Sequence, residues 1–257
     1  MVPEISLSLP RPVTSLHQIE ITSKCSLSCS YCIWPKLGRA KHDMTMETYV
    51  EVLRHVDFFV NQELSQGEVN LAGIGESTLH PNFVEMVKKA RHLIGRSTFL
   101  TFATNGTEWD EDLAKALAPY MSQSEGFQPG VFVSLHRPEK AKKAVDLCRK
   151  YGLLAGVSND PALNTIDWAG QVPFTVTAPT DRPCPWIRQG RVIAFSSGKV
   201  GSCCMDGGEN SVIGHVNDPV GTWKTQPWSL CESCDQQVGV KGYNQYPSGG
   251  RKLPVRK

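Results

Sequence analysis

The sequence has 257 residues, of which 40% are hydrophobic and 20% are charged, and its formal net charge at pH 7 is +2. These values are typical of a globular protein and give the molecule as a whole no strong electrostatic preference for nucleic acid or for a membrane surface. No apolar run approaches the roughly 18 residues that a membrane span requires, and residues 1–12 do not resemble a signal peptide, so we expect a cytoplasmic protein without a membrane partner.

From residue 17 onward, strand patterns and helical patterns alternate along the chain. The periodicity predicts strands over residues 17–22, 69–73, 98–103 and 131–135, with weaker candidates over 153–157 and 173–176. It predicts helices over residues 46–60, 83–94, 110–120 and 139–151, the first behind Thr45 as an N-cap. Five or six βαβ units are too few to close an eight-stranded barrel. We therefore expect an α/β fold, a partial (β/α)6 TIM-like barrel, with its site at the C-terminal ends of the strands.

The pattern changes after about residue 179, where the helical periodicity stops. Residues 191–197 and 199–203 predict two short strands joined by a tight turn at Ser197 and Gly198. We expect four regions: an N-terminal extension over 1–16, the barrel over 17–178, a small β-hairpin-containing domain over 179–240 and a basic, flexible tail over 241–257. A basic tail of this kind does not by itself indicate nucleic-acid binding.

Nine cysteines lie mostly near the two ends of the chain, which favours metal binding in a reducing compartment over a disulfide framework. The first group, Cys25, Cys29 and Cys32, has the spacing C-x3-C-x2-C directly after the first predicted strand. Three thiolates can hold three irons of a [4Fe–4S] cluster and leave the fourth iron open for chemistry. The alternative is a structural zinc site, for which the nearest further candidate ligand is His42.

This group resembles the signature of the radical S-adenosylmethionine (SAM) superfamily, C-x3-C-x-aromatic-C, in which Tyr31 fills the aromatic position. Three further segments are similar to family motifs in the expected order. The first, Gly73-Ile74-Gly75-Glu76, is similar to the Gly-Gly-Glu motif with one glycine offset, and the residues after it resemble the run GEPxLHP. The second is Thr104-Asn105-Gly106, and the third is Val133-Ser134-Leu135. On these matches together the chain is identified as a member of the superfamily.

The resemblance implies SAM contacts for seven residues: Tyr31, Ile33, Gly73, Gly75, Glu76, Asn105 and Ser134. The glycines would let backbone carbonyls approach the methionyl ammonium because no Cβ intervenes. From the residues alone, Ser134 stays open to being a plain strand-end hydroxyl, and Asn105 to a purely turn-forming role. His80, His136 and His215 are expected to be structural.

The resemblance also implies the chemistry. A reduced cluster, supplied with electrons by an external flavodoxin- or ferredoxin-type protein, cleaves SAM, and the 5′-deoxyadenosyl radical takes a hydrogen atom from the substrate. The protein must position one C–H bond and exclude water.

A second group comprises Cys184, Cys203, Cys231 and Cys234. Its opening, C-x13-G-x4-C around Gly198, resembles the SPASM and Twitch auxiliary-cluster domains, and the short form resembles Twitch. The resemblance implies a second [4Fe–4S] cluster saturated by four cysteines. A four-cysteine zinc ribbon is the alternative. Cys204 lies beside Cys203, and only the family spacing favours Cys203 as the ligand.

A saturated second cluster favours an oxidation, a dehydrogenation in which it accepts one electron. Redox-neutral rearrangement of a nucleotide or modified base, modification of a ribosomal peptide and a non-catalytic zinc-binding module stay open as alternatives. The substrate is accordingly a small molecule, a nucleotide or a peptide. Cys204 and Cys148 are candidate hydrogen donors for an epimerase, although Cys148 shares a predicted helix face with small apolar residues and fits a buried hydrophobe better.

Overall fold

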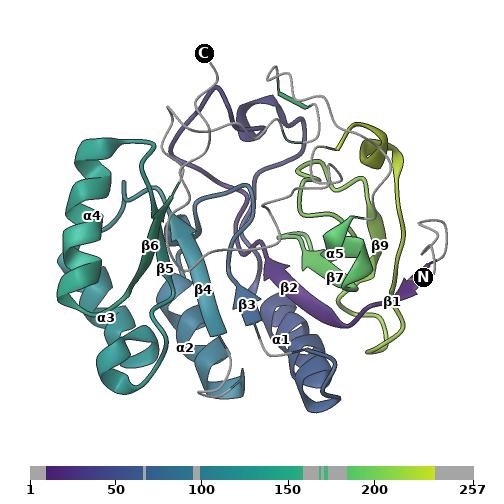
Figure 1. Ribbon diagram of the computed structural model, residues 1–257, viewed down its shortest axis with the longest axis horizontal. Helices are drawn as coiled ribbons and strands as arrows, with labels where there is room; N and C mark the ends of the chain where they lie inside the picture. Colours follow the sequence, from purple (N-terminus) through teal and green to yellow (C-terminus); the bar gives the residue numbers. More distant parts are fainter. Residues whose placement is uncertain are drawn as a thin grey trace, which may run out of the picture.

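The computed structural model describes residues 10–65, 68–94, 99–158, 168, 171–172 and 184–234. Its central element is an eight-stranded sheet with the order β6-β5-β4-β3-β2-β7-β8-β9 (Figure 1). The strands of this sheet are β2 (Ser15–Ile19), β3 (Glu68–Asn70), β4 (Phe99–Thr104), β5 (Val131–Ser134), β6 (Leu154–Ser158), β7 (Arg191–Ala194), β8 (Lys199–Gly201) and β9 (Val212–His215).

The strands from β6 to β7 run parallel, and β8 and β9 add antiparallel strands at one edge. The helices α1 (Met46–Asn61), α2 (Phe83–Ile94), α3 (Glu111–Met121) and α4 (Pro138–Lys150) connect β2 to β6 in turn. Figure 1 shows these helices along one side of the sheet. Within the described residues the sheet ends at β6 and β9, which agrees with the expected mixed α/β, parallel-rich partial barrel.

The helix predictions are confirmed to within one or two residues because local signals determine them. The Thr45 side chain accepts a hydrogen bond from the backbone N–H of Thr48 and caps α1. The four residues predicted to form one face of the second helix, Phe83, Val87, Ala90 and Ile94, are all buried in α2. Asp110 caps α3 by accepting from Leu113 N. The shorter elements η1 (Trp34–Lys36), η2 (Ser77–Leu79), η3 (Gln123–Glu125) and α5 (Pro185–Arg188) lie in the connections.

The first predicted strand, over residues 17–22, differs most from the observed one. β2 begins two residues earlier, at Ser15, and pairs with β7 from Ser15 to Ile19 across an irregularity between Leu16 and Gln18. The backbone beyond Ile19 stays tied to β7 through Glu20 N and Ala194 O, 2.8 Å apart. The position of β2 is thus set by a strand far away in the sequence, which its own pattern does not reveal.

The predicted hairpin after residue 190 is confirmed. Gly198 adopts φ +86° in the turn between β7 and β8, a conformation that other residues rarely tolerate. The hairpin continues the central sheet, since β7 pairs with β2. The strand predicted over residues 173–176, the boundary near 178–183 and the tail over 241–257 lie outside the described residues, so the domain division remains a prediction.

Two short strands tie the N-terminal segment to the C-terminal part. β1 (Arg11–Pro12) pairs antiparallel with β10 (Lys224–Thr225), which precedes η4 (Ser229–Ser233). Nearby, Trp223 stacks on His55 of α1 with ring centroids 3.9 Å apart. Among the helices of the described residues, none combines the length and apolarity that crossing a membrane requires.

Candidate functional site

The first cysteine group lies in the loop that follows β2. The Leu27 N–H lies 3.5 Å from Cys25 Sγ, and the Trp34 N–H lies 3.4 Å from Cys32 Sγ. The pKa of Cys25 is raised to about 11, chiefly by burial and also by Glu76, Cys32 and Cys29, while the Leu27 N–H acts in the opposite direction. Cys29 and Cys32 raise the pKa of Cys25, and Cys29 raises that of Cys32, so these sulfur atoms lie within electrostatic reach. Bound cationic iron would relieve the repulsion between the thiolates.

This donor set therefore fits an iron–sulfur cluster, in which each thiolate binds a different iron. In the part of the chain that the structure describes, no three His, Cys, Asp or Glu side chains are grouped so as to hold a metal ion. Metal analysis of the purified chain distinguishes the iron–sulfur cluster from the zinc alternative.

Gly75 packs against the backbone of the cysteine loop. A Cβ atom at this position would lie 2.2 Å from Thr22 O and 2.8 Å from Lys24 O. The next amide, Glu76 N, donates to Lys24 O over 2.7 Å. Glycine is thus required here by a backbone contact that fixes the start of the cysteine loop, in addition to any contact with SAM.

Glu76 connects the ends of two strands. Its buried carboxylate accepts hydrogen bonds from Asn105 N at 2.7 Å and from Thr78 Oγ1 at 2.7 Å. Burial raises its pKa, while these hydrogen bonds act in the opposite direction. Asn105 in turn accepts from Thr107 N over 2.8 Å, so it does form the turn that its sequence context suggests.

The remaining predicted SAM contacts lie at the C-terminal ends of the strands or in the cysteine loop. Ser134 ends β5 and is buried, with its Oγ 3.5 Å from Ser158 Oγ at the end of β6. Ile33 is buried in the cysteine loop. Gly73 makes room for Glu20, because a Cβ there would lie 2.4 Å from Glu20 Cγ.

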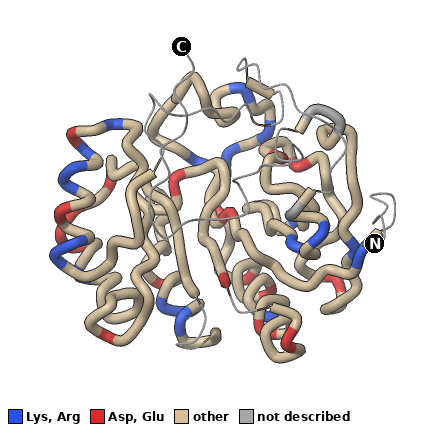
Figure 2. The backbone as a smooth tube through the Cα atoms, in the orientation of Figure 1, with Lys and Arg blue, Asp and Glu red and all other residues tan. Residues whose placement is uncertain are grey.

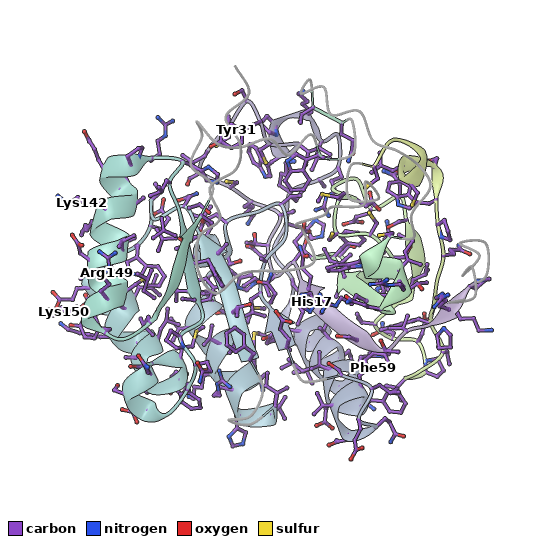
Figure 3. All side chains as sticks on the ribbon, viewed as in Figure 1. His17, Tyr31, Phe59, Lys142, Arg149 and Lys150 are labelled. Carbon is purple, nitrogen blue, oxygen red and sulfur yellow. The ribbon has the colours of Figure 1, made fainter. Side chains whose placement is uncertain are left out.

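Tyr31 pairs with a residue that was expected to be only structural. Its hydroxyl shares a short hydrogen bond with His136 Nδ1, just beyond β5 (Figure 3 labels Tyr31). Burial raises the pKa of Tyr31 and lowers that of His136, so the imidazole favours its neutral form. By contrast, His80 contacts Met44 O through Nε2 at 2.9 Å and Asn82 N through Nδ1 at 3.0 Å, as a structural histidine does.

The second cysteine group draws on three segments: Cys184 before α5, Cys203 and Cys204 after β8, and Cys231 and Cys234 in and after η4. Burial raises the pKa of Cys203 to about 12, and Cys234 and Cys184 add to this shift. The pKa of Cys184 is also raised, mainly by burial and in addition by Cys231. In Figure 3 sulfur atoms gather beside α5 and β9. These cysteines therefore lie within electrostatic reach of one another despite their separation in sequence.

The two candidate hydrogen donors have different surroundings. Burial raises the pKa of Cys204 well above its usual value, and Cys203, Cys184 and Cys234 raise it further, so Cys204 belongs to the second group. Cys148 is fully buried in the core on α4, and burial raises its pKa to about 12. Its position agrees with the interpretation as a small buried hydrophobe.

Sequence reasoning missed a buried ion pair beside the cysteine loop. Arg39 donates to both oxygens of Glu20, at 2.7 and 2.6 Å, and also contacts Glu209. In the sequence Glu20 is one polar position of the alternating pattern over residues 17–22, so nothing marks it as a partner of Arg39. Figure 2 shows the charged positions along the backbone. Several Lys and Arg positions lie in the loops at the end of the sheet that carries the cysteine loop.

Comparisons with known proteins identify the family of the chain and related folds. A family described as the radical SAM superfamily matches residues 19–170. A cofactor-modifying protein of the tungsten-containing aldehyde ferredoxin oxidoreductase of Pyrococcus furiosus is 31% identical over 39% of this chain and 26% of its own length. The GTP 3′,8-cyclase of Streptomyces coelicolor is 27% identical over 72% of this chain. That match spans 59% of the cyclase, so the chain covers only part of the length of these relatives.

Two solved structures share the fold. BtrN in complex with AdoMet and 2-DOIA superimposes with a TM-score of 0.59 at 17% identity, covering 80% of this chain and 79% of BtrN. The structure of anSMEcpe with bound AdoMet and a peptide gives a TM-score of 0.52 at 16% identity, covering 81% of this chain and 79% of that one. At these identities the likeness concerns the fold alone.

Proposed function

Because the chain belongs to the radical SAM superfamily, whose members bind a [4Fe–4S] cluster and SAM, we propose that it is an enzyme that oxidises its substrate by two electrons. The observation that carries this proposal is a second group of cysteines, separate from the loop after β2, in which Cys184 and Cys234 lie within electrostatic reach of Cys203. A second redox group would give the substrate radical an acceptor for one electron.

In the first site, Cys25, Cys29 and Cys32 would hold three irons of the cluster and leave one for SAM. The cluster and SAM would supply a 5′-deoxyadenosyl radical that removes one hydrogen atom from the substrate. The chain's own residues would fix the loop: Gly75 holds it against the end of β3, and Glu76 connects that strand end to β4. The pair of Tyr31 and His136 would orient the aromatic side chain between the cysteines.

In the second site, Cys184, Cys203, Cys231 and Cys234 would saturate one [4Fe–4S] cluster, which would supply a one-electron acceptor. The balance of the oxidation is then complete. The substrate would lose one hydrogen atom to the 5′-deoxyadenosyl radical, and the resulting substrate radical would lose one electron to this acceptor and one proton to a base or to water. A new double bond or a crosslink would result. An external flavodoxin- or ferredoxin-type protein would supply the electron that starts the reaction.

A redox-neutral reaction on a nucleotide is the second candidate, and one observation favours it. The aligned segment of the GTP 3′,8-cyclase extends over 72% of this chain, well beyond the cysteine loop. An oxidation consumes one SAM per product, whereas an isomerisation that regenerates SAM consumes less. The ratio of 5′-deoxyadenosine to product, measured with small-molecule, nucleotide and peptide substrates, separates oxidation from isomerisation.

The test of the proposal itself needs no substrate. Iron and sulfide analysis of the anaerobically reconstituted chain should give about eight of each per chain, as two four-iron clusters require. Zinc in place of iron at the second cysteine group, with about four irons in total, would overturn the proposed oxidation and leave the superfamily membership intact.

A further inference from the structure

One arginine connects the two cysteine groups through buried charges. Arg39 lies in the first cysteine loop and has a side chain only 10% exposed. Its Nη2 contacts Glu20, at the end of β2, and its Nη1 contacts Glu209, in the loop that follows Cys203 and Cys204. The side chains of these carboxylates are 1% and 8% exposed.

The charges of this cluster balance only when it is complete. Two buried carboxylates share one guanidinium, and Lys199 Nζ lies 3.2 Å from the other oxygen of Glu209. Ser196 donates to Glu20 through both its Oγ, at 2.9 Å, and its N–H, at 3.3 Å. Removing one partner of such a cluster strands the remaining buried charges without compensation.

The backbone of Glu209 indicates that this contact is imposed on the loop. Glu209 has φ +58°, in the left-handed region that non-glycine residues rarely adopt. Such a conformation persists where the surroundings over-determine it, and here two cations hold the side chain. The neighbouring Asp206 also shapes the loop, since it accepts from Gly208 N at 3.1 Å and from Ser211 N at 2.5 Å.

A second, independent connection joins the same two loops. Trp168 donates through Nε1 to Tyr31 O over 3.1 Å, and Gln171 donates through Nε2 to Met205 O over 2.9 Å. Gln171 also donates to Trp168 O at 2.7 Å. Ile33 and Leu37 of the first loop reach the same place, because a Cβ at Gly207 would lie 3.2 and 3.1 Å from their side chains.

We propose that Arg39 is a positioning residue that locks the first cysteine loop against the loop carrying Cys203 and Cys204, and thereby fixes the two iron–sulfur sites relative to each other. This role rests on the proposed function for the second site. Arginine suits it because two different nitrogens of one rigid plane serve two carboxylates, whereas the single ammonium of lysine would have to choose between them.

Amide hydrogen exchange of the full reconstituted chain tests the lock directly. We expect Arg39→Met to raise exchange at least tenfold for the amides of Asp206, Gly207 and Ser211, which are hydrogen-bonded within the second loop. Arg39→Lys should retain protection near β2 and lose it in the second loop. The control Lys24→Met breaks an exposed ion pair of the same cysteine loop and should leave the second loop unchanged.

Glu209→Gln serves where Arg39→Met does not fold, because it leaves the pair of Glu20 and Arg39 intact. It should raise exchange in the second loop alone. Exchange of residues 205–211 at the wild-type rate in Glu209→Gln and in any folded Arg39→Met would overturn the proposal.

A spectroscopic readout separates positioning of the iron site from mere loosening. In a Cys29→Ala background, the reduced electron paramagnetic resonance spectrum reports the second cluster alone. Adding Arg39→Met should change this spectrum, and adding Lys24→Met should not; an unchanged spectrum with Arg39→Met would also overturn the proposal. If Cys29→Ala binds no iron, the proposed second cluster is wrong, and the exchange data still decide whether Arg39 locks the two loops.

Discussion

The first cysteine group occupies one short loop after β2, whereas the second draws its thiols from segments between Cys184 and Cys234 that come together only in the folded chain. The first loop is held by backbone contacts to neighbouring strand ends, such as that between Glu76 N and Lys24 O. The second group forms only when α5, the hairpin of β7 and β8, and η4 are all in place. A local site of this kind tolerates partial loss of structure elsewhere, and an assembled site does not.

The largest expected effect is on SAM cleavage, which should depend on the first cysteine group and not on the second. Cys29→Ala should abolish formation of 5′-deoxyadenosine under dithionite, because the proposed SAM-binding cluster would lose one of its three ligands. Cys234→Ala should retain this uncoupled SAM cleavage and lose only about half of the iron. Chromatographic measurement of 5′-deoxyadenosine checks SAM cleavage by both variants, and iron analysis checks the iron content of Cys234→Ala. Cys148→Ala, in the core, is the matched control, and cleavage by Cys29→Ala at the wild-type rate would contradict the assignment of the first site.

The next effect concerns the backbone contact under the first loop. Gly75→Ala places a Cβ against the carbonyl oxygens of Thr22 and Lys24, so the loop must move, at a cost of about 3 kcal/mol. Iron should be lost from the first site and kept in the second. Urea unfolding and iron analysis measure the two effects. Gly38→Ala, in the same loop with nothing within 4 Å of its added Cβ, should change neither.

How much the sequence could predict follows the same division. Cys25, Cys29 and Cys32, the cap at Thr45 and the apolar face of α2 were predictable because each depends on residues a few positions apart. The pairing of β7 with β2, the contact of Arg39 with Glu209 and that of His136 with Tyr31 join residues more than a hundred positions apart. Nothing in their own neighbourhoods marks them, since a lone charge or histidine has many possible partners.

Acid should weaken the region around the second group first. His17 of β2 packs edge-on against Trp186 of α5, with ring centroids 5.4 Å apart. Burial, with Arg191 adding to it, lowers the pKa of His17 to about 4 from 6.5. The unfolded chain therefore binds a proton at His17 below about pH 6.5, whereas the folded chain binds it only below about pH 4. Stability should fall by about 2 kcal/mol from this group between pH 7 and pH 5.

Urea unfolding at the two pH values measures this loss. His17→Gln should remove that part of the pH dependence, whereas His92→Gln, at an exposed position of α2, should leave it. An equal pH dependence in both variants would exclude His17 as the cause.

The smallest effect tests the hairpin of the second region. Gly198→Ala forces a left-handed conformation on a residue with a Cβ and should destabilise the chain by about 1 kcal/mol. The added atom would also lie 2.7 Å from His215 Nε2. Iron in the second site should fall before iron in the first as urea is raised, and loss in the opposite order would reverse the comparison between the two regions.

The place of β7 in the sheet has a consequence for protein engineering and for synthesis in the cell. β2 has β3 on one side and β7 on the other, so a fragment cut at residue 178 would leave one flank of β2 with unpaired backbone groups. It would also deprive the Glu20 carboxylate of its Ser196 donors. Residues 19–170, which the family matches, lack β7 and thus one of the two neighbours of β2. In a nascent chain the central strand β2 can gain its second neighbour only after residues 191–194 have left the ribosome.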